Sequence, residues 1–204
     1  MLMLFLKKTR PCRKSWPSFN MPVSTLNIEQ SALALLDGDV VAIATEAVWG
    51  LSCDPFNQSA VHHLLSIKSR PVEKGLILVA SQFGQIENLL SPTLLESEKQ
   101  KLLMQQKQPI SWLVPCSNAV PDWVTGQNDF MAIRITRHPV LKSLCESIGG
   151  PIISTSANPA GCQPAREIFQ LKRYFGDEIL ICKGRVGASQ QPSQIRNLLT
   201  DEVI

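Results

Sequence analysis

The chain has 204 residues, of which 44% are hydrophobic and 18% are charged, and its formal net charge is +3. This composition is sufficient for one substantial core and excludes a wholly disordered chain. Residues 1–20 hold five basic residues and no acidic residue, so residues 21–204 carry a charge of −2 without them. The balance argues against a domain that binds nucleic acid through overall positive charge.

Residues 1–20 differ in pattern from the rest of the chain. Met1–Leu6 is apolar, but six residues are too few to span a bilayer, and basic residues follow this run instead of preceding it as in a signal peptide. Met21 begins a regularly patterned segment, in which Ser24 or Thr25 is available to cap a first helix. We therefore expect residues 1–20 to be a disordered N-terminal extension, or an upstream reading of the start site, and residues 21–204 to form one domain.

Apolar spacing within residues 21–204 predicts helices that alternate with strands. In chain order we expect helix 28–36, strand 40–44, loop 45–55, helix 59–68, strand 75–80, helices 83–90 and 94–104, strands 111–115 and 130–136, helix 140–148, strand 151–154, helix 168–175, strand 179–182 and a loop to residue 192. This alternation indicates an α/β fold with a mixed β-sheet flanked by helices.

The cysteines and histidines are too scattered for a metal site. The chain has six cysteines without a C-x-x-C pair, and only three histidines, so neither a zinc site nor a disulfide framework is predicted. We expect reduced thiols in a cytoplasmic protein. Cys53 and Cys145 lie in apolar segments and are interpreted as packing residues.

Two cations stand at the end of the predicted helix 59–68. Lys68 and Arg70 are followed by Pro71, which ends the helix. At a helix end both side chains can turn toward one ligand, and an ammonium and a guanidinium suit phosphate oxygens. The alternative is a solvated helix end, where cations offset the helix dipole by a few tenths of a kcal/mol. The sequence leaves both interpretations open.

A run of hydroxyl and amide side chains, Ser154-Thr155-Ser156-Ala157-Asn158, follows the apolar strand 151–154. The carboxyl ends of strands line ligand-binding crevices in α/β sheets, so these side chains are placed to bind a ligand. The alternative is a turn that such residues stabilise by bonding to their own backbone.

Other polar residues are further candidates for a binding site. Arg134 lies in an apolar strand and must face either solvent or an anion. Thr45-Glu46 follows a buried strand and can either order a substrate or cap the next turn. Ser193 and Arg196 combine a hydroxyl with a cation near the C-terminus. Together these residues predict a site for a polyphosphate and a small hydroxy amino acid, without a nucleophile from the protein. No G-x-x-x-x-G-K-[ST] pattern occurs, so a P-loop is excluded.

The motifs as a set resemble the YrdC-like domain of threonylcarbamoyl-AMP synthases of the bacterial TsaC type, over nearly all of residues 25–200. The matching motifs are TEAVWG at 45–50, CDP at 53–55, IKSRPVEKGLILVA at 67–80, WLVP at 112–115, DWVTG at 122–126, MAIRITRHP at 131–139, STSANPAG at 154–161 and PSQIR at 192–196. The resemblance implies a single-domain, twisted mixed sheet with a concave, positively charged cleft.

The resemblance also implies an activity. The family condenses L-threonine, bicarbonate or CO2, and ATP into L-threonylcarbamoyladenylate, releasing pyrophosphate, which is a nucleotidyltransferase reaction. A partner transferase complex then moves the threonylcarbamoyl group to tRNA beside the anticodon. Mg²⁺ is expected to arrive with the nucleotide and no metal site is expected in the protein. Weak RNA binding is possible for such an enzyme, and no membrane association is expected.

Site roles carry over by position in the motifs. The residues expected to bind ATP are Lys68, Arg70, Lys74, Ser156, Asn158 and Arg196. Of these, Lys68 and Arg70 are also expected to be catalytic. The residues expected to hold threonine or its carbamate are Thr45, Arg134, Ser154 and Ser193. Arg134 is expected to face a carboxylate.

The chain departs from the family pattern at three places. Ala44 replaces the usual proline before Thr45, residues 106–110 (QKQPI) replace a W-P-G-P run, and Asn197 replaces an acidic residue. We expect a looser turn at residue 45 and a remodelled loop at 106–110.

Two alternatives remain at this stage. One is a non-catalytic RNA-binding module in RNA or ribosome maturation, which would bind RNA in a salt-dependent way without ATP turnover. The other is a regulatory nucleotide-binding subunit that has lost catalysis, which the altered loop suggests.

Overall fold

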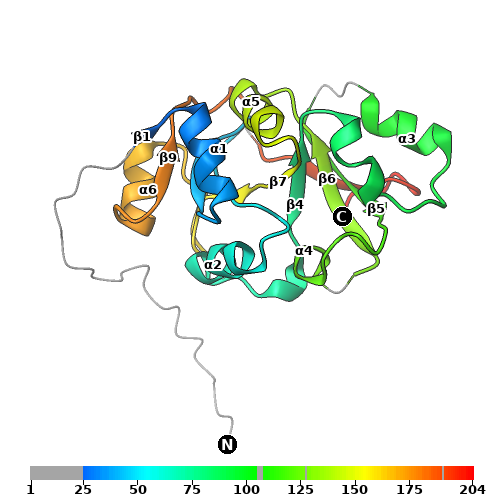
Figure 1. Cartoon of the computed structure of the whole chain (residues 1–204), viewed down its shortest axis with the longest axis horizontal. Helices are drawn as coiled ribbons and strands as arrows, with labels where there is room; N and C mark the ends of the chain where they lie inside the picture. The colour runs from blue at the N-terminus through cyan, green and yellow to red at the C-terminus, as the bar shows by residue number, and fades with distance from the viewer. Residues whose placement is uncertain (1–24, 105–107, 127, 190) are drawn as a thin grey trace, which may run out of the picture.

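The computed structural model describes residues 25–104, 108–126, 128–189 and 191–204. The predicted N-terminal extension, residues 1–20, therefore lies outside the described residues. The described strands form two five-stranded sheets, named here sheet A and sheet B (Figure 1). Sheet A has the order β1 (Thr25–Leu26), β9 (Leu180–Cys182), β2 (Val41–Ala44), β3 (Trp49–Ser52) and β8 (Thr155–Ser156). Sheet B has the order β10 (Gln194–Asn197), β5 (Ile110–Pro115), β6 (Phe130–Ile135), β4 (Ile77–Ala80) and β7 (Ile152–Ile153).

Both sheets are mixed, as predicted. In sheet A, β9 pairs parallel with β1 and β2, whereas β3 pairs antiparallel with β2 and β8. In sheet B, β5–β10 and β4–β6 are parallel pairs, and β5–β6 and β4–β7 are antiparallel. The predicted α/β class with flanking helices is confirmed, and the strands are divided between two sheets.

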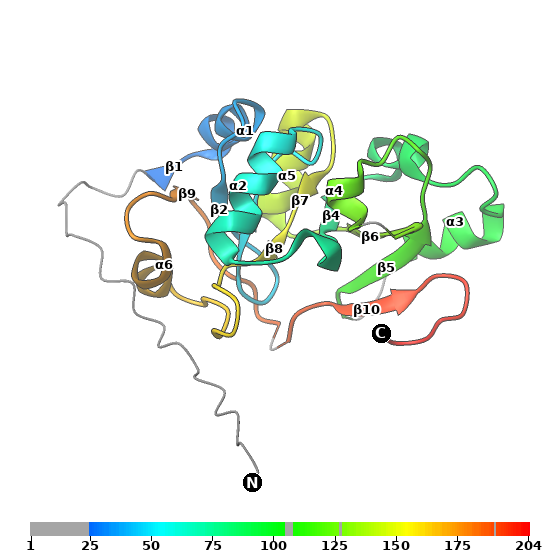
Figure 2. The ribbon, with the colours of Figure 1, turned by 90° about the horizontal axis from the view of Figure 1, so that it is seen from below.

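The helices cover both faces of the sheets. They are α1 (Ile28–Leu36), α2 (Gln58–Lys68), α3 (Glu96–Leu103), α4 (Asp122–Thr125), α5 (Pro139–Ile148) and α6 (Ile168–Phe175), with 3₁₀ turns at Val72–Lys74, Phe83–Gln85 and Glu87–Leu89. Helices α1 and α5 pack together on one face, and α2 lies on the other (Figures 1 and 2). None of the helices in the described part of the chain is long and apolar enough to cross a membrane.

Strand β2 shows how one sheet is buried on both faces. Val41 and Ile43 belong to the hydrophobic cluster under α1 and α5, whereas Ala42 and Ala44 belong to the cluster that contains Leu64 of α2. Side chains alternate between the two faces of a strand, so a strand buried on both faces is an uninterrupted apolar run. This is why the sequence pattern predicted the strand at 40–44 well.

The two sheets meet at Ser154, which lies between β7 and β8. The backbone N–H of Ile153 donates to the carbonyl of Cys53, which follows β3, at 3.0 Å. The N–H of the next residue, Ser154, donates to Ile77 in β4 at 2.9 Å. Successive residues thus bond to different sheets, and the hydroxyl-rich turn that follows is placed at their junction.

The predicted thiol roles are confirmed for the two cysteines singled out. Cys53 and Cys145 are free and fully buried. Burial raises the pKa of both thiols, that of Cys145 to about 12, so neither is ionised near neutral pH.

Several sequence predictions need correction. The region predicted as loop 45–55 contains β3, a short strand that its Gly and small residues concealed. Segment 83–90 forms two 3₁₀ turns instead of a helix, consistent with the cost of Gly84 inside a helix. Asn27 caps α1, accepting from the N–H of Gln30 at 2.9 Å, in place of Ser24 or Thr25. Ser24 lies outside the described residues. Strands β1, β8 and β10 and helix α4 were not predicted.

The approach of Gly126 to the 73–75 turn gives a test of the fold. A Cβ on Gly126 would lie 2.5 Å from Gly75 N and 2.6 Å from Glu73 O. Gly149 has a similar positive φ, 75° against 68°, but a Cβ there would meet nothing within 4 Å. We expect Gly149→Ala to cost about 1 kcal/mol of unfolding free energy, from backbone strain alone. Gly126→Ala should cost about 1–3 kcal/mol more, from the added clash.

Urea unfolding of the two variants measures the difference, because both carry the same backbone penalty. Equal midpoints would contradict the close approach of Gly126 to the 73–75 turn.

Candidate functional site

Lys68 joins the end of α2 to the hydroxyl-rich turn. Helix α2 ends at Lys68 because Ser69 takes a left-handed conformation with φ 51°. Lys68 is only 4% exposed, and its Nζ donates to the carbonyl of Asn158 at 2.9 Å and to that of Ser156. The interpretation of Lys68 as a solvated helix end is therefore wrong. Lys68 and the Ser154–Asn158 turn form one cluster, as the binding-site interpretation required.

Burial also changes the titration of Lys68. Loss of solvation, with repulsion from Arg70, lowers the pKa of Lys68 from 10.5 to about 8. An ammonium has three N–H donors, and two of them are used on the carbonyls. One donor therefore remains on a charged group at the junction of the sheets.

Arg70 lies on the next turn, beside Lys68. Its Nη2 donates to the carbonyls of Gly75 at 3.0 Å and Lys74 at 3.4 Å, and burial lowers the pKa of the guanidinium. Its Nε is buried without a hydrogen-bond partner in the described structure. Lys74 is exposed on the same turn. An open hollow of about 550 Å³ is lined by His62, Leu65, Ser66, Ser69, Arg70, Pro71 and Val72.

Asn158 is used inside the turn itself. Its Nδ2 donates to the carbonyls of Cys162 at 2.8 Å and Pro159 at 3.0 Å, while its Oδ1 is buried without a partner among the described residues. The interpretation of the segment as a self-bonded turn is therefore correct for the amide of Asn158. Ser156 is partly exposed on β8.

Thr45 and Ser154 converge across Gly50. A Cβ on Gly50 would lie 3.1 Å from Thr45 Cγ2 and 3.3 Å from Ser154 Oγ. The Thr45 hydroxyl donates to the carbonyl of Val48 at 2.8 Å, which closes the turn between β2 and β3. The turn is closed although Ala44 replaces the proline of the family, so the looser turn that we expected is not observed.

Arg134 on β6 faces the protein interior. The residue is 9% exposed, and its Nη1 lies 3.2 Å from Glu46 Oε2. Burial lowers the pKa of Arg134, and the Glu46 carboxylate opposes that shift. A solvent-facing Arg134 is thus excluded, and the anion that it meets here is Glu46.

The Arg134–Glu46 pair opens on a cavity of about 380 Å³. The cavity is lined by Glu46, Leu102, Leu103, Met104, Gln108, Pro109, Ile110, Trp112, Arg134, Ile135, Arg137 and His138. Gln108, Pro109 and Ile110 belong to the segment in which the chain departs from the family pattern. The altered segment therefore forms part of the wall beside Arg134. Residues 106 and 107 of that segment lie outside the described residues.

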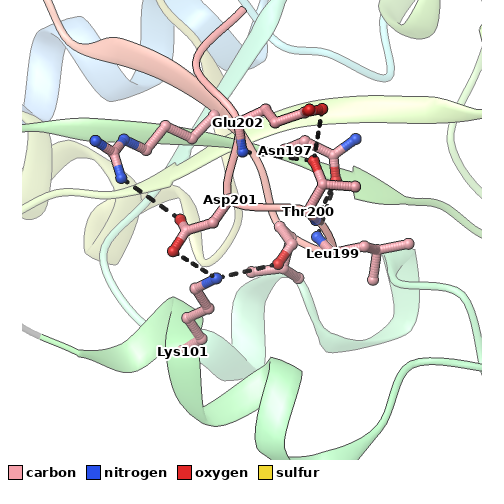
Figure 3. Close-up of polar contacts among 8 residues, drawn as sticks. Lys101, Asn197, Leu199, Thr200, Asp201 and Glu202 are labelled. Carbon is pink, nitrogen blue, oxygen red and sulfur yellow. Dashed lines mark hydrogen bonds and ion pairs between the residues drawn. The ribbon is translucent and has the colours of Figure 1, made fainter.

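Ser193 and Arg196 are held near β5 and the C-terminus. The hydroxyls of Ser193 and Ser111 share a hydrogen bond of 2.9 Å. Arg196 Nη1 lies 3.5 Å from Asp201, which is also 3.3 Å from Lys101 Nζ (Figure 3). Asn197, which replaces an acidic residue, accepts from the N–H of Leu199 and so closes the C-terminal turn. A nucleotide contact by Arg196 stays a prediction.

Sequence reasoning singled out Glu46 only together with Thr45 and did not include it in the predicted site, whereas the structure places it against Arg134. The available signal was its position directly after a buried strand, next to Thr45. Thr136, which donates to Glu46 Oε1 at 2.8 Å, was also missed. Among the described residues, no group of three or more His, Cys, Asp or Glu is arranged to hold a metal ion.

Comparison with known proteins places this geometry in a family. The chain is 45% identical to a threonylcarbamoyl-AMP synthase of Marinobacter nauticus, covering 88% of the chain and 95% of that protein. It is 44% identical to a protein of the same name from Cellvibrio japonicus, covering 87% of the chain and 94% of that protein.

A solved structure of P. abyssi Sua5 complexed with L-threonine has the same fold, with a TM-score of 0.79 and 24% identity over 88% of the chain. The chain spans 55% of the length of that structure. The family model described as Telomere recombination matches residues 33–204. Because this match includes strands of both sheets and the Lys68 cluster, the chain belongs to the Sua5/YciO/YrdC family.

Proposed function

We propose that this protein is an L-threonylcarbamoyladenylate synthase. The observation that carries the proposal is the identity of 44–45%, over nearly the full length of both proteins, with relatives named threonylcarbamoyl-AMP synthase. The substrates are L-threonine, bicarbonate or CO2, and ATP, and the products are L-threonylcarbamoyladenylate and pyrophosphate. The reaction class is nucleotidyl transfer. The buried cation at Lys68, next to a hydroxyl-rich turn, supports a role in binding a polyphosphate.

In the proposed reaction, the nucleophile comes from the substrate. The amine of threonine becomes a carbamate, and a carbamate oxygen attacks the α-phosphorus of ATP. An oxygen–phosphorus bond forms as the bond to pyrophosphate breaks, and pyrophosphate carries away the electron pair. The protein then contributes positioning and charge stabilisation instead of covalent chemistry. This agrees with a site made of cations and hydroxyls.

The nucleotide end of the site consists of the cations after α2. Lys68, Arg70 and Lys74 bind the phosphates, forming a positively charged cleft with Ser156 and Asn158 on its other side. The remaining N–H of Lys68 and the unpartnered Nε of Arg70 support this role, because both are donors without acceptors in the described structure. Arg196 is the weakest candidate of the set, since Asp201 already neutralises its charge.

The amino-acid end of the site lies at the junction of the sheets. Thr45 and Ser154 supply hydroxyls there for threonine or its carbamate, and Arg134 receives the carboxylate. Ser193, which bonds to Ser111 of β5, is proposed as a further hydroxyl. The convergence of Thr45 and Ser154 on Gly50 supports this assignment, because a side chain at residue 50 would fill the space between them.

Mg²⁺ is proposed to arrive with the triphosphate as part of the substrate. Bound to the triphosphate, it would neutralise phosphate charge and polarise the α-phosphate. The product is proposed to pass to a transferase complex that modifies tRNA. A cytoplasmic location also stays a prediction.

Incubation of the protein with L-threonine, bicarbonate and ATP tests the proposed function. Pyrophosphate and L-threonylcarbamoyladenylate should form together, and omission of threonine or bicarbonate should stop both. Salt-dependent RNA binding without pyrophosphate release would instead favour an RNA-binding module. Nucleotide binding without turnover would favour a regulatory subunit.

Loss of either predicted catalytic cation should reduce turnover. We expect Arg70→Ala to lower the rate of pyrophosphate release about 30-fold to 1000-fold, as for other electrostatic contacts to a transition state. Lys68→Ala should lower the rate similarly and also destabilise the fold, because the carbonyls of Ser156 and Asn158 lose a buried donor. The control is Lys142→Ala on α5, where the lysine is half exposed and pairs with Glu146. Near-normal turnover in Arg70→Ala would contradict its assignment.

The lowered pKa of Lys68 predicts a pH effect on catalysis. Lys68 loses its charge as pH rises through about 8, so kcat/KM for ATP should fall there. The unfolded chain binds more protons than the folded chain between about 8 and 10.5, so deprotonation of Lys68 adds stability in that window. A loss of activity as Lys68 deprotonates is therefore not caused by a destabilising effect of that residue on the fold.

Rates of pyrophosphate release from about pH 6.5 to about 9.5 measure this fall in activity. The fall should remain in Lys74→Arg. It should be absent from the residual activity of Lys68→Arg, because the guanidinium of the new arginine stays charged. A fall in activity that persists in Lys68→Arg would show that another group is responsible for it.

A further inference from the structure

The proposed threonine-binding residues leave one charge of the substrate without a partner. Thr45, Ser154 and Ser193 offer hydroxyls, and Arg134 offers a cation for the carboxylate. A free α-amino acid also carries an ammonium group, and burying a charge without a counter-charge is costly. The inference below rests on the proposed function and concerns that ammonium group.

Glu46 is the acidic side chain that lines the cavity beside Arg134. Its Oε1 accepts a hydrogen bond from the Thr136 hydroxyl at 2.8 Å, which fixes the carboxylate from one side. Its Oε2 is 3.2 Å from Arg134 Nη1, yet this oxygen is buried without a hydrogen-bond partner in the described structure. The Nε of Arg134 is buried and unpartnered as well. The two side chains are thus joined by an ion pair that is not a well-aligned hydrogen bond, and the Nε donor of Arg134 is unused in the described structure.

The backbone of Glu46 is also fixed in place. The N–H of Ser189 donates to the Glu46 carbonyl at 3.0 Å, and that of Gly187 donates to the Thr45 carbonyl at 2.8 Å. A Cβ on Gly187 would lie 2.6 Å from the Glu46 carbonyl oxygen, so this contact requires glycine. The segment that leads from β9 toward β10 therefore holds Glu46 at the cavity wall.

We propose that Glu46 binds the α-ammonium group of L-threonine while Arg134 binds its carboxylate. A guanidinium beside a carboxylate matches the two charges of an amino acid: the guanidinium attracts its carboxylate, and the carboxylate attracts its ammonium group. Without substrate the two side chains neutralise each other by direct contact at the cavity wall. With substrate each takes the opposite charge of the amino acid, and Thr136 keeps Glu46 oriented throughout. Glu46 then selects an amino acid over a hydroxy acid that lacks the amine.

Calorimetry with two ligands tests this role. L-Threonine and 3-hydroxybutyrate share a carboxylate and a hydroxyl, but the second lacks the amine. Each is titrated into wild type and Glu46→Gln in the presence of α,β-methylene-ATP, which cannot be cleaved at the reacting bond. We expect Glu46→Gln to weaken L-threonine binding about 10-fold to 100-fold, the effect of losing a charged hydrogen bond. Binding of 3-hydroxybutyrate should be unchanged or tighter, because a carboxylate that repels it is removed.

Comparison of the two ligands shows whether Glu46 binds the amine of threonine or only positions Arg134. If Glu46 only positions Arg134, the variant loses both ligands to the same extent, and the proposal is overturned. Unchanged threonine binding overturns it too. Glu46→Asp should recover part of the threonine affinity, and Glu146→Gln on the exposed face of α5 is the matched control. A wild type that neither binds threonine nor releases pyrophosphate refutes the proposed function itself, whereas a normal wild type with an unaffected variant refutes the Glu46 role alone.

Discussion

The contact of the Lys68 ammonium with the carbonyls of Ser156 and Asn158 is the interaction on which the site depends. An ammonium is excluded from a protein interior unless hydrogen bonds replace its hydration. Here two backbone carbonyls do so, and they belong to the turn where the chain crosses from sheet B to sheet A. The end of α2 and the junction of the sheets are therefore held together by a buried charge.

The Arg134–Glu46 pair is a second charge contact, with a different character. Both groups are side chains, and the Nε of Arg134 has no hydrogen-bond partner in the described structure. A buried ion pair of this kind is weak evidence for stability, because desolvation offsets much of the attraction. Its position in a cavity, next to the Thr45–Ser154 convergence, agrees better with a role in binding. The Lys68 cluster is closed by the backbone, whereas the proposed role of this pair is to exchange partners when threonine binds.

The departures from the family pattern lie at the edges of this arrangement. The Gln108–Ile110 part of the altered loop lines the cavity beside Arg134, and Asn197 closes the C-terminal turn that holds Asp201 near Arg196. Ala44 ends a fully buried strand and leaves the Thr45 turn closed. None of these changes removes a cation or a hydroxyl from the proposed site.

The sequence by itself determined the α/β class, the long helices and the buried strands, because apolar periodicity reports burial directly. It also identified Lys68, Arg70, Thr45 and the Ser154–Asn158 turn as polar groups at the ends of apolar elements, and Arg134 as a cation within an apolar strand. Short strands such as β3, β8 and β10 were missed, since their pairing depends on partners distant in sequence.

Only the tertiary structure decided which charges are buried and what they contact. A solvated and a buried Lys68 have the same local sequence, and the choice between them is made by carbonyls that lie 88 and 90 residues away. The same holds for Glu46, whose partner Arg134 is brought to it by the packing of sheet B beside sheet A. Long-range electrostatic pairing has no periodic signature along a chain, so it becomes visible only when the fold places the two groups together.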